Sequence, residues 1–271
     1  MRLVKVIFLS TIVGFCMNAN AQAVNPIPTI NDNWRFSGTI SGWTPASWTT
    51  TTVGNLSKTG DTSISDNLNS SGAVAFFTAE AHKGNWGAMA DIVYWQLSGS
   101  DSFSKTKYVH GNDRTLYGGS NAQQTQTMLT LAGTYTGYRS ENLYVDGLAG
   151  IRYISSTITI QANTQYSVNG NTRLDASRYP SYTNQTTDPV IGFKGRARIY
   201  NSSWFVPFYV DGGKGPGSNN TTWQALLGVG DAFSWGDITL AYRAMGFDLK
   251  SNIGVTKYTN AGPQLSATIN F

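Results

Sequence analysis

The stretch GPQLSATINF, Gly262–Phe271, decides the fold class of this 271-residue sequence. Its polar and apolar residues alternate at every step, with Gln, Ser, Thr and Asn in one set of positions and Leu, Ala, Ile and Phe in the other. Because successive side chains of a β-strand point to opposite faces, this alternation predicts a strand with one polar and one apolar face. The aromatic Phe271 is the last residue of the apolar set.

The same two-residue period recurs in further segments along the sequence. No apolar run after residue 21 approaches the roughly 20 residues that a transmembrane helix requires, and no helical period is sustained. The sequence therefore predicts an all-β fold of about ten strands, with eight as the alternative. The other predicted strands cover residues 33–43, 73–81, 86–95, 127–137, 143–153, 190–200, 203–212, 221–230 and 237–247.

The predicted connections alternate in length. Short turns follow the second, fourth, sixth and eighth strands, whereas longer segments follow the others, at residues 44–72, 98–123, 155–187, 212–220 and 249–261. Short turns at one end and long loops at the other are typical of transmembrane up-and-down antiparallel β-barrels. Lipid offers no hydrogen-bond partners to the backbone, so no strand edge can stay unpaired in the bilayer and the barrel must close. The alternative is a soluble β-sandwich or lipocalin-like barrel, in which the apolar faces would lie inside.

The predicted strand directions place outward aromatic residues at the two ends of the barrel, as membrane interfaces favour. At the expected periplasmic ends we find Trp34, Trp86, Tyr135, Trp204, Phe233 and Phe271, and near the expected outer ends Tyr94, Tyr153, Phe193 and Trp223.

The first 21 residues have the three parts of a secretory signal peptide: two basic residues, an apolar run, and small residues that end in Ala21. We expect cleavage after Ala21, with Ala23 as second choice and lipoprotein processing at Cys16 as an alternative. Residues 22–271 are then one barrel domain without cysteine. Losing Arg2 and Lys5 leaves 17 basic and 15 acidic residues, so nucleic acid is not an expected partner.

If the apolar faces meet lipid, the polar faces line the lumen and bring many charges into a narrow space. An unpaired charge there is costly, so we predict a network of paired charges. Lys194, Arg196 and Arg198 would repel one another unless an acid such as Glu80 intervenes. The predicted lumen charges are Arg35, Glu80, Asp91, Asp146, Arg152, Lys194, Arg196, Arg198, Asp211 and Arg243.

Two interpretations of these charges remain open. In the first, paired charges fill the lumen as apolar side chains fill a soluble core. In the second, they line a narrow water path for small, anionic solutes. A barrel of eight to ten strands is near the size that side chains can fill, whereas wide aqueous pores need about sixteen strands.

The remaining alternative is an outer-membrane enzyme, a protease or a lipid-modifying enzyme, with its site at the extracellular rim. Ten-stranded outer-membrane proteases have a similar architecture and use an Asp–His pair with two further aspartates at the extracellular rim, but this sequence has no Asp-Asp pair. His110 lies near Asp113 in a predicted outer loop, and His82 is expected to be an exposed turn residue. No motif indicates a metal or cofactor. Residues 63–72 predict a short helical turn capped by Ser63 or Ser65.

Residues from about 140 to 250 resemble a family of uncharacterised bacterial outer-membrane β-barrel proteins, similar to the small OmpA and OmpW barrels. The family pattern has a D-P-x-x-G-x-[RK] strand, an Asp followed by two glycines, a T-W-Q strand and a Y-R pair. Asp231-Ala232 departs from it, because an aromatic-Arg pair is usual there. The matching residues are Asp188, Pro189, Gly192, Lys194, Asp211, Gly212, Gly213, Thr222, Trp223, Gln224, Tyr242 and Arg243, together with LAGIRY at 148–153.

This resemblance implies a closed barrel in the bacterial outer membrane and no particular activity. The expected partners are outer-membrane lipids and the barrel-assembly machinery, which would read the terminal Phe271. The expected orientation places the long loops outside the cell and both termini in the periplasm.

Overall fold

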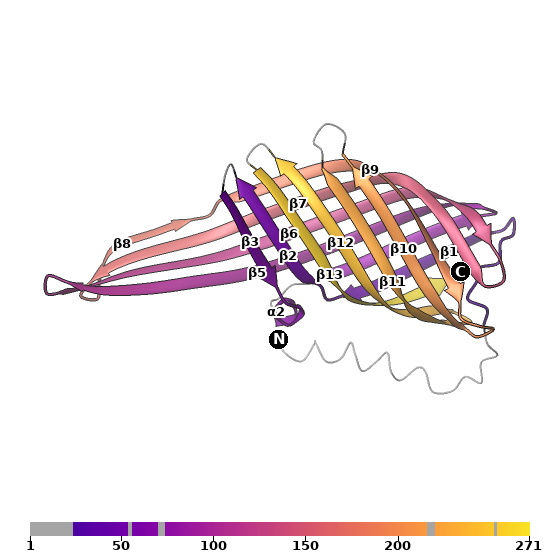
Figure 1. The fold of residues 1–271 in the computed structure, drawn as a ribbon, viewed down its shortest axis with the longest axis horizontal. Helices are drawn as coiled ribbons and strands as arrows, with labels where there is room; N and C mark the ends of the chain where they lie inside the picture. Colours follow the sequence, from indigo (N-terminus) through magenta and orange to yellow (C-terminus); the bar gives the residue numbers. More distant parts are fainter. Residues whose placement is uncertain (1–23, 54–55, 70–73, 216–219, 252–253) are drawn as a thin grey trace.

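The computed structural model describes residues 24–53, 56–69, 74–215, 220–251 and 254–271. The predicted signal peptide, residues 1–21, lies outside the described residues. The described chain is almost entirely β-structure, with one six-residue helix, α2, at Ile64–Asn69. No described helix has the length and apolar character needed to cross a bilayer. Figure 1 shows a barrel from which several strands continue as a long sheet.

Ten strands form the barrel, each antiparallel to its neighbours. Pairing of the first strand with the last closes the sheet. The predicted all-β, closed, ten-stranded antiparallel barrel is therefore confirmed, and the eight-stranded alternative is wrong. In order around the barrel, the strands are β1 (Trp34–Trp43), β4 (Val74–Lys83), β5 (Trp86–Val109), β6 (Asn112–Arg139), β7 (Leu143–Val168), β9 (Ser181–Arg198), β10 (Trp204–Lys214), β11 (Thr221–Phe233), β12 (Gly236–Ser251) and β13 (Gly254–Asn270).

Four short turns join strands at one end of the barrel, which we call the turn end. They are β4–β5, β6–β7, β9–β10 and β11–β12, as the sequence predicts. At the opposite end, the predicted long loops are mostly strand, so that part of the prediction is wrong. Residues 98–123 and 155–187 lie almost wholly in β5 to β9. Their Ser-, Thr- and Gln-rich strands bury few apolar groups, and hydrophobic alternation therefore does not reveal them.

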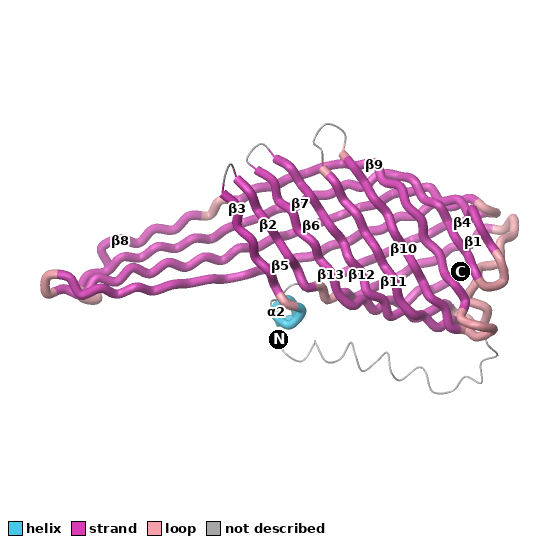
Figure 2. The backbone as a smooth tube through the Cα atoms, in the orientation of Figure 1, coloured by secondary structure: helices cyan, strands magenta, loops and turns pink. Residues whose placement is uncertain are grey.

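These extensions form a sheet beyond the barrel, which we call the arm (Figure 2). It comprises residues 96–125 of β5 and β6, 155–168 of β7, β8 (Asn171–Arg178) and 181–187 of β9. The arm has four strand positions, and β8 and the start of β9 together fill the fourth. β8 and the start of β9 pair in succession with β7, and the backbone N–H of Ile160 donates to Pro180 between them at 2.9 Å.

The strand that pairs with β13 to close the barrel is interrupted between Trp43 and Ala46, so this closing seam has two parts. The second half of β13 pairs with β1, and its first half pairs with β2 (Ala46–Val53), which forms a hairpin with β3 (Leu56–Thr62). Pro45, which has no N–H to donate, lies at the break. A side chain at the facing Gly262 would come within 2.2 Å of the Thr44 carbonyl oxygen, so this approach requires glycine.

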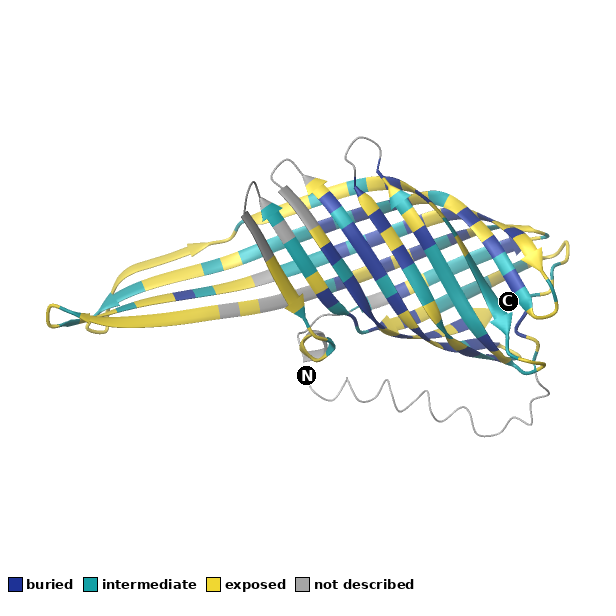
Figure 3. Ribbon diagram, viewed as in Figure 1, coloured by how far each residue is buried: buried dark blue, intermediate teal, exposed yellow. Residues whose placement is uncertain are grey.

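Exposed and buried residues alternate along the barrel strands (Figure 3). Ile40, Ile191 and Leu240 are 69%, 72% and 61% exposed, whereas Asp146 and Arg152 are fully buried. The apolar faces therefore point outward and the charged faces inward. This arrangement excludes the soluble sandwich or lipocalin-like alternative.

Aromatic side chains mark both ends of the barrel wall. At the turn end, Trp34, Phe36 and Phe271 form a continuous stack with centroid separations of 5.8 and 6.0 Å. At the other end, Tyr94 is exposed near the point where β5 leaves the barrel, and Trp223 is exposed near the start of β11. The short helix α2 forms where predicted, and Ser63 caps it by accepting a hydrogen bond from the Asp66 N–H at 3.2 Å.

The closing seam predicts a specific crosslink. Thr39 and Thr268 are directly opposite in the β1–β13 register, and their Oγ1 atoms are 3.0 Å apart. Opposed residues of antiparallel strands have Cα separations of about 4.5–5.5 Å, within disulfide range. Thr39→Cys with Thr268→Cys, in a chain that lacks Cys16, should form a disulfide on oxidation, seen as a mobility shift on a non-reducing gel.

The matched control pairs Thr39→Cys with Ser266→Cys, which is two residues out of register. Diagonal positions are about 7–8 Å apart and should crosslink poorly. Equal crosslinking by the two pairs would contradict the register.

Candidate functional site: the barrel lumen

Ion pairs across the lumen connect strands that are not neighbours. The Lys194 ammonium on β9 pairs with Glu80 on β4, across the three intervening strands β5, β6 and β7. Arg243 on β12 donates to Asp91 on β5 at 3.3 Å, again across three strands. Each pair therefore fixes the position of one wall of the barrel relative to another.

Arg152 is the centre of the most buried group. Its guanidinium pairs with Asp211 and donates to Thr130 Oγ1 and Thr222 Oγ1, each at 3.1 Å. The side chains of Arg152 and Asp211 are fully buried. Tyr209 and Gln224 also donate to Asp211, and Arg243 donates to Gln224, which links this group to Asp91. A buried charge with this many partners is stabilised only while the partners remain.

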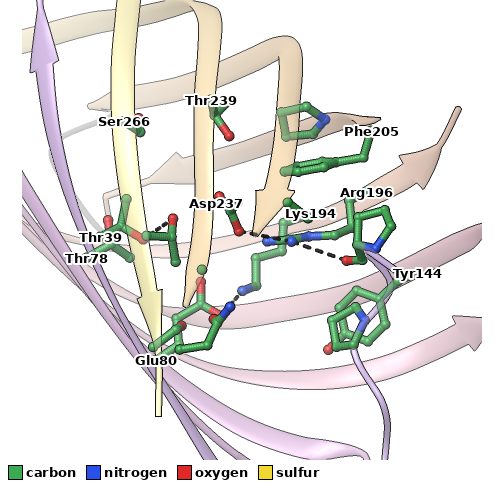
Figure 4. Close-up of a pocket in the computed structure, with 18 of the residues that line it drawn as sticks. Thr39, Thr78, Glu80, Tyr144, Lys194, Arg196, Phe205, Asp237, Thr239 and Ser266 are labelled. Carbon is green, nitrogen blue, oxygen red and sulfur yellow. Dashed lines mark hydrogen bonds and ion pairs between the residues drawn. The ribbon is translucent and has the colours of Figure 1, made fainter. Parts of the chain in front are cut away.

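A polar cavity of about 700 Å³ occupies the lumen at the turn end. Hydroxyls of Thr39, Thr78, Thr239 and Ser266 line one side, and Glu80, Lys194, Arg196 and Asp237 line another (Figure 4). Arg196 donates to Asp237 at 3.1 Å, and its guanidinium lies 4.5 Å from the centre of the Phe205 ring.

The first described residues line this cavity at the turn end. Residues 24–29 contribute to its lining, and Ile27 is only 5% exposed. The Pro26 carbonyl accepts a hydrogen bond from Arg196 at 3.2 Å. The Asn31 carbonyl accepts one from the N–H of Gly84 in the β4–β5 turn at 3.0 Å. The segment is therefore anchored both inside the lumen and at its mouth.

An apolar cluster fills the lumen at the arm end. It joins β1, β4, β5, β6, β7, β12 and β13, and its rings touch in sequence from Trp43 to Trp95 to Phe247 to Tyr258, with centroid separations of 6.4, 5.9 and 4.7 Å. The Tyr258 hydroxyl donates to the buried Gln126. The buried members are Trp43, Phe76, Val93, Trp95, Met128, Ile154, Met245, Phe247, Leu249 and Tyr258.

The polar and apolar layers meet at Arg243. Its guanidinium lies 4.5 Å from the centre of the Phe76 ring, while one of its nitrogens contacts Asp91. The Arg152 group fills the remaining side of the lumen, with Thr222 and Gln224 of β11 only 2% and 1% exposed. Together the two layers contain buried side chains from β1, β4, β5, β6, β7, β10, β11, β12 and β13.

The predicted lumen charges fall into several groups. Glu80, Asp146 and Lys194 lie together, Arg152 pairs with Asp211, and Asp91 pairs with Arg243. Arg198 instead donates to the Ser202 carbonyl at 2.8 Å beside a turn. Within the described residues, Nε and Nη2 of Arg35 are buried without a hydrogen-bond partner. The functional role of the set stays a prediction.

Several lumen residues were missed by the sequence analysis. Asp237 pairs with Arg196, and Asp188 lies opposite Arg152 in the β7–β9 register. Both could have been found, because strict alternation from Arg243 and from Lys194 along their own strands places them inward. The apolar cluster also left a signal: at Ile92–Trp95 both faces of the strand are apolar.

Neither histidine lies where an Asp–His catalytic pair needs it. His82 was expected to be exposed, but it is an inward residue of β4, 7% exposed, and its Nε2 lies 3.1 Å from Glu80. His110 lies at the β5–β6 turn at the tip of the arm with φ of 49°. Asp113 nearby donates its N–H to Asn169. Among the described residues, no three His, Cys, Asp or Glu side chains could together hold a metal ion.

Comparison with solved structures finds other barrels. The outer-membrane protease OmpT of Escherichia coli matches with a TM-score of 0.52 at 10% identity, over 92% of this chain and 100% of that chain. The translocator domain of autotransporter NalP from Neisseria meningitidis has a TM-score of 0.34, with 10% identity over 99% of this chain and 95% of that chain. No protein-family model and no curated protein matches the sequence.

The fold is therefore that of the bacterial outer-membrane β-barrels. At 10% identity the likeness to the protease shows a shared fold alone. The finer resemblance to small OmpA and OmpW barrels stays a prediction.

The Arg152 group predicts a large loss of stability when its pairing is broken. Arg152→Met leaves Asp211 buried without its cation, which should cost about 3–5 kcal/mol of unfolding free energy in a urea titration of the refolded protein. Lys257→Met removes a cation that is 63% exposed and paired with Asp248, so it should cost less than about 1 kcal/mol.

The double variant Arg152→Met with Asp211→Leu removes both charges. It should recover part of the loss, because Asp211 is then no longer left in the lumen as a buried charge without its cation. A double variant less stable than Arg152→Met alone would contradict the pairing as the cause.

Proposed function

We propose that this protein is an integral outer-membrane barrel whose lumen is closed to solutes and whose function lies in the arm at its outer end. The observation that carries the proposal is the pair of filled layers in the lumen. A conducting path would need a continuous run of water from one mouth to the other. Instead, Val93, Met128, Ile154 and Met245 are 0% exposed in the apolar cluster at the arm end of the lumen.

The outer surface of the barrel supports membrane placement. Leu131, Ile151, Ile191, Leu227 and Leu240 point outward and are 44–72% exposed, which is costly in water but suits lipid. Aromatic side chains lie at both ends of this apolar surface, where they suit the membrane–water interfaces. Ten-stranded closure leaves no barrel strand with an open edge in the apolar layer.

The proposed orientation follows from the two unlike ends. Short turns face the periplasm and longer segments face outward in bacterial outer-membrane barrels, so the arm would stand outside the cell. Phe271 and the segment that begins at Val24 both lie at the turn end, which would be periplasmic. This placement agrees with a cleaved signal peptide at residues 1–21 and with reading of Phe271 by the barrel-assembly machinery.

Because the proposed lumen is closed, we expect the barrel not to conduct ions. The refolded chain should give no conductance steps in planar bilayers. A variant without residues 24–30 should show no conductance either, because the apolar cluster still closes the arm end of the lumen. A known large porin, refolded in the same lipid, is the positive control. Regular steps from either chain would instead support the narrow-channel alternative.

Membrane placement predicts a depth-dependent cost of charge. Leu240→Arg should destabilise the protein by about 2–4 kcal/mol in urea titrations from lipid vesicles, because the arginine would face acyl chains. Ser102→Arg lies on the arm, away from the proposed bilayer, and should change stability by no more than about 0.5 kcal/mol. Similar effects from the two substitutions would argue against lipid at Leu240.

A further inference from the structure

The arm has two chemically different faces. The register of β5 carries the lumen-facing side at Trp95 on to Phe103, Lys105 and Lys107 without a bulge. We call this the inner face of the arm and the opposite one its outer face. In the barrel, the outer face continues as the apolar wall and the inner face continues as the lumen.

The outer face carries mostly hydroxyls and amides, several of which hydrogen-bond to one another, together with the exposed Tyr108 and Tyr117. Thr106 and Thr115 lie with Oγ1 atoms 2.9 Å apart, as do Thr157 and Thr183. Such a face is well solvated and needs no covering partner.

The inner face is apolar and basic, and it is uncovered. One row across four strands reads Lys105, Leu116, Tyr166 and Leu174. Leu116, Leu174 and Phe103 are 40%, 53% and 54% exposed. The Phe103 ring lies across Gly118, where a Cβ would come within 2.3 Å of it. Apolar groups left exposed together on one face mark an interaction surface.

Charge on this face is unbalanced. Lys105, Lys107, Arg114 and Arg178 hold inner-face positions and are exposed. In the described residues, none of these four cations forms an ion pair. The face therefore complements an anionic partner that also has apolar groups.

One edge beside this face is unpaired. β4 pairs with β5 only as far as Trp95, and of the described strands only β6 pairs with β5 from Gln96 to Val109. An unpaired strand edge presents rows of N–H and C=O groups that can pair with another extended chain. Phe103, Lys105 and Lys107 are the inner-face side chains next to this edge.

We propose that the arm binds an extended, acidic polypeptide segment, which adds as a strand to the free edge of β5. Its acidic side chains would lie opposite Lys105 and Lys107, and an apolar side chain would lie opposite Phe103. Cross-strand pairs of opposite charge and of apolar groups stabilise such a strand. This proposal rests on the proposed function only in taking the arm as the working surface.

Two other occupants fit less well. A second copy paired edge to edge through β5 brings lysine-bearing edges together, and like charges across strands are destabilising. The surrounding bilayer contacts the apolar wall of the barrel, and the outer face of the arm continues that wall. Lipid would therefore lie on the side of the outer face and not of the inner face. The hydrogen-bonding edge favours a polypeptide over an anionic polysaccharide.

The test uses the full barrel in detergent micelles and a fluorescent synthetic peptide. Glu, Glu and Leu occupy alternate positions of this peptide, separated by Thr, so that one face matches Lys107, Lys105 and Phe103 in antiparallel order. Lys105→Gln with Lys107→Gln should weaken binding about tenfold in anisotropy titrations, as expected for two exposed charge pairs. A peptide with Lys in place of Glu should not bind.

The matched control has the same change in net charge on the outer face. Asn121 and Asn163 are exposed there, and Asn121→Asp with Asn163→Asp also lowers the charge by two while preserving side-chain size. This variant should bind like the parent chain. A peptide N-methylated at alternate residues keeps its side chains but loses edge hydrogen bonds, and it should bind weakly.

Three results would overturn the proposal. They are equal binding by the lysine variant and its control, undiminished binding of the N-methylated peptide, and no binding by the parent chain while the lysine variant self-associates. In the last case the lysines would serve only to protect the edge. Dextran sulfate bound as tightly as the peptide, and equally lost in the lysine variant, would point to polysaccharide instead. None of these readouts depends on bilayer conductance or on orientation in a membrane.

Discussion

Closure of the sheet between β1 and β13 is the constraint on which the rest of the structure depends. Once the sheet closes, each alternating strand must present one face to the surroundings and the other to a confined lumen. The apolar residues are outside, so the charged residues share the confined lumen. The free-energy cost of burying these charges is offset only when cations and anions pair. The pairs Lys194–Glu80 and Arg243–Asp91 form across the lumen, between strands that are not neighbours.

The two halves of the lumen satisfy this constraint in different ways. Near the turn end, a cavity lined by hydroxyls and charges remains, with residues 24–29 at its mouth. Near the arm end, aromatic and aliphatic side chains pack together as in a soluble core. Arg243 connects the halves, since its guanidinium contacts both Asp91 and the Phe76 ring.

The arm inherits its two faces from the barrel. Its outer face continues the lipid-facing side but has exchanged apolar residues for hydroxyls, as water requires. Its inner face continues the lumen side, yet beyond the barrel no opposite wall covers it. Apolar and basic side chains that would be buried and paired inside a barrel are therefore exposed at Phe103, Lys105 and Leu116. The proposed polypeptide would supply the missing neighbour at the β5 edge.

The sequence by itself determined the fold class, the ten barrel strands, the four short turns and which face of each strand is polar. It could do so because a two-residue period is local and each strand carries it independently. Only the tertiary structure decided which charges meet, because Arg196 and Asp237 are brought together by the curvature of the closed sheet. It also decided that polar segments such as 98–123 are strands, since hydrogen bonds to neighbouring strands, and not buried apolar groups, hold them.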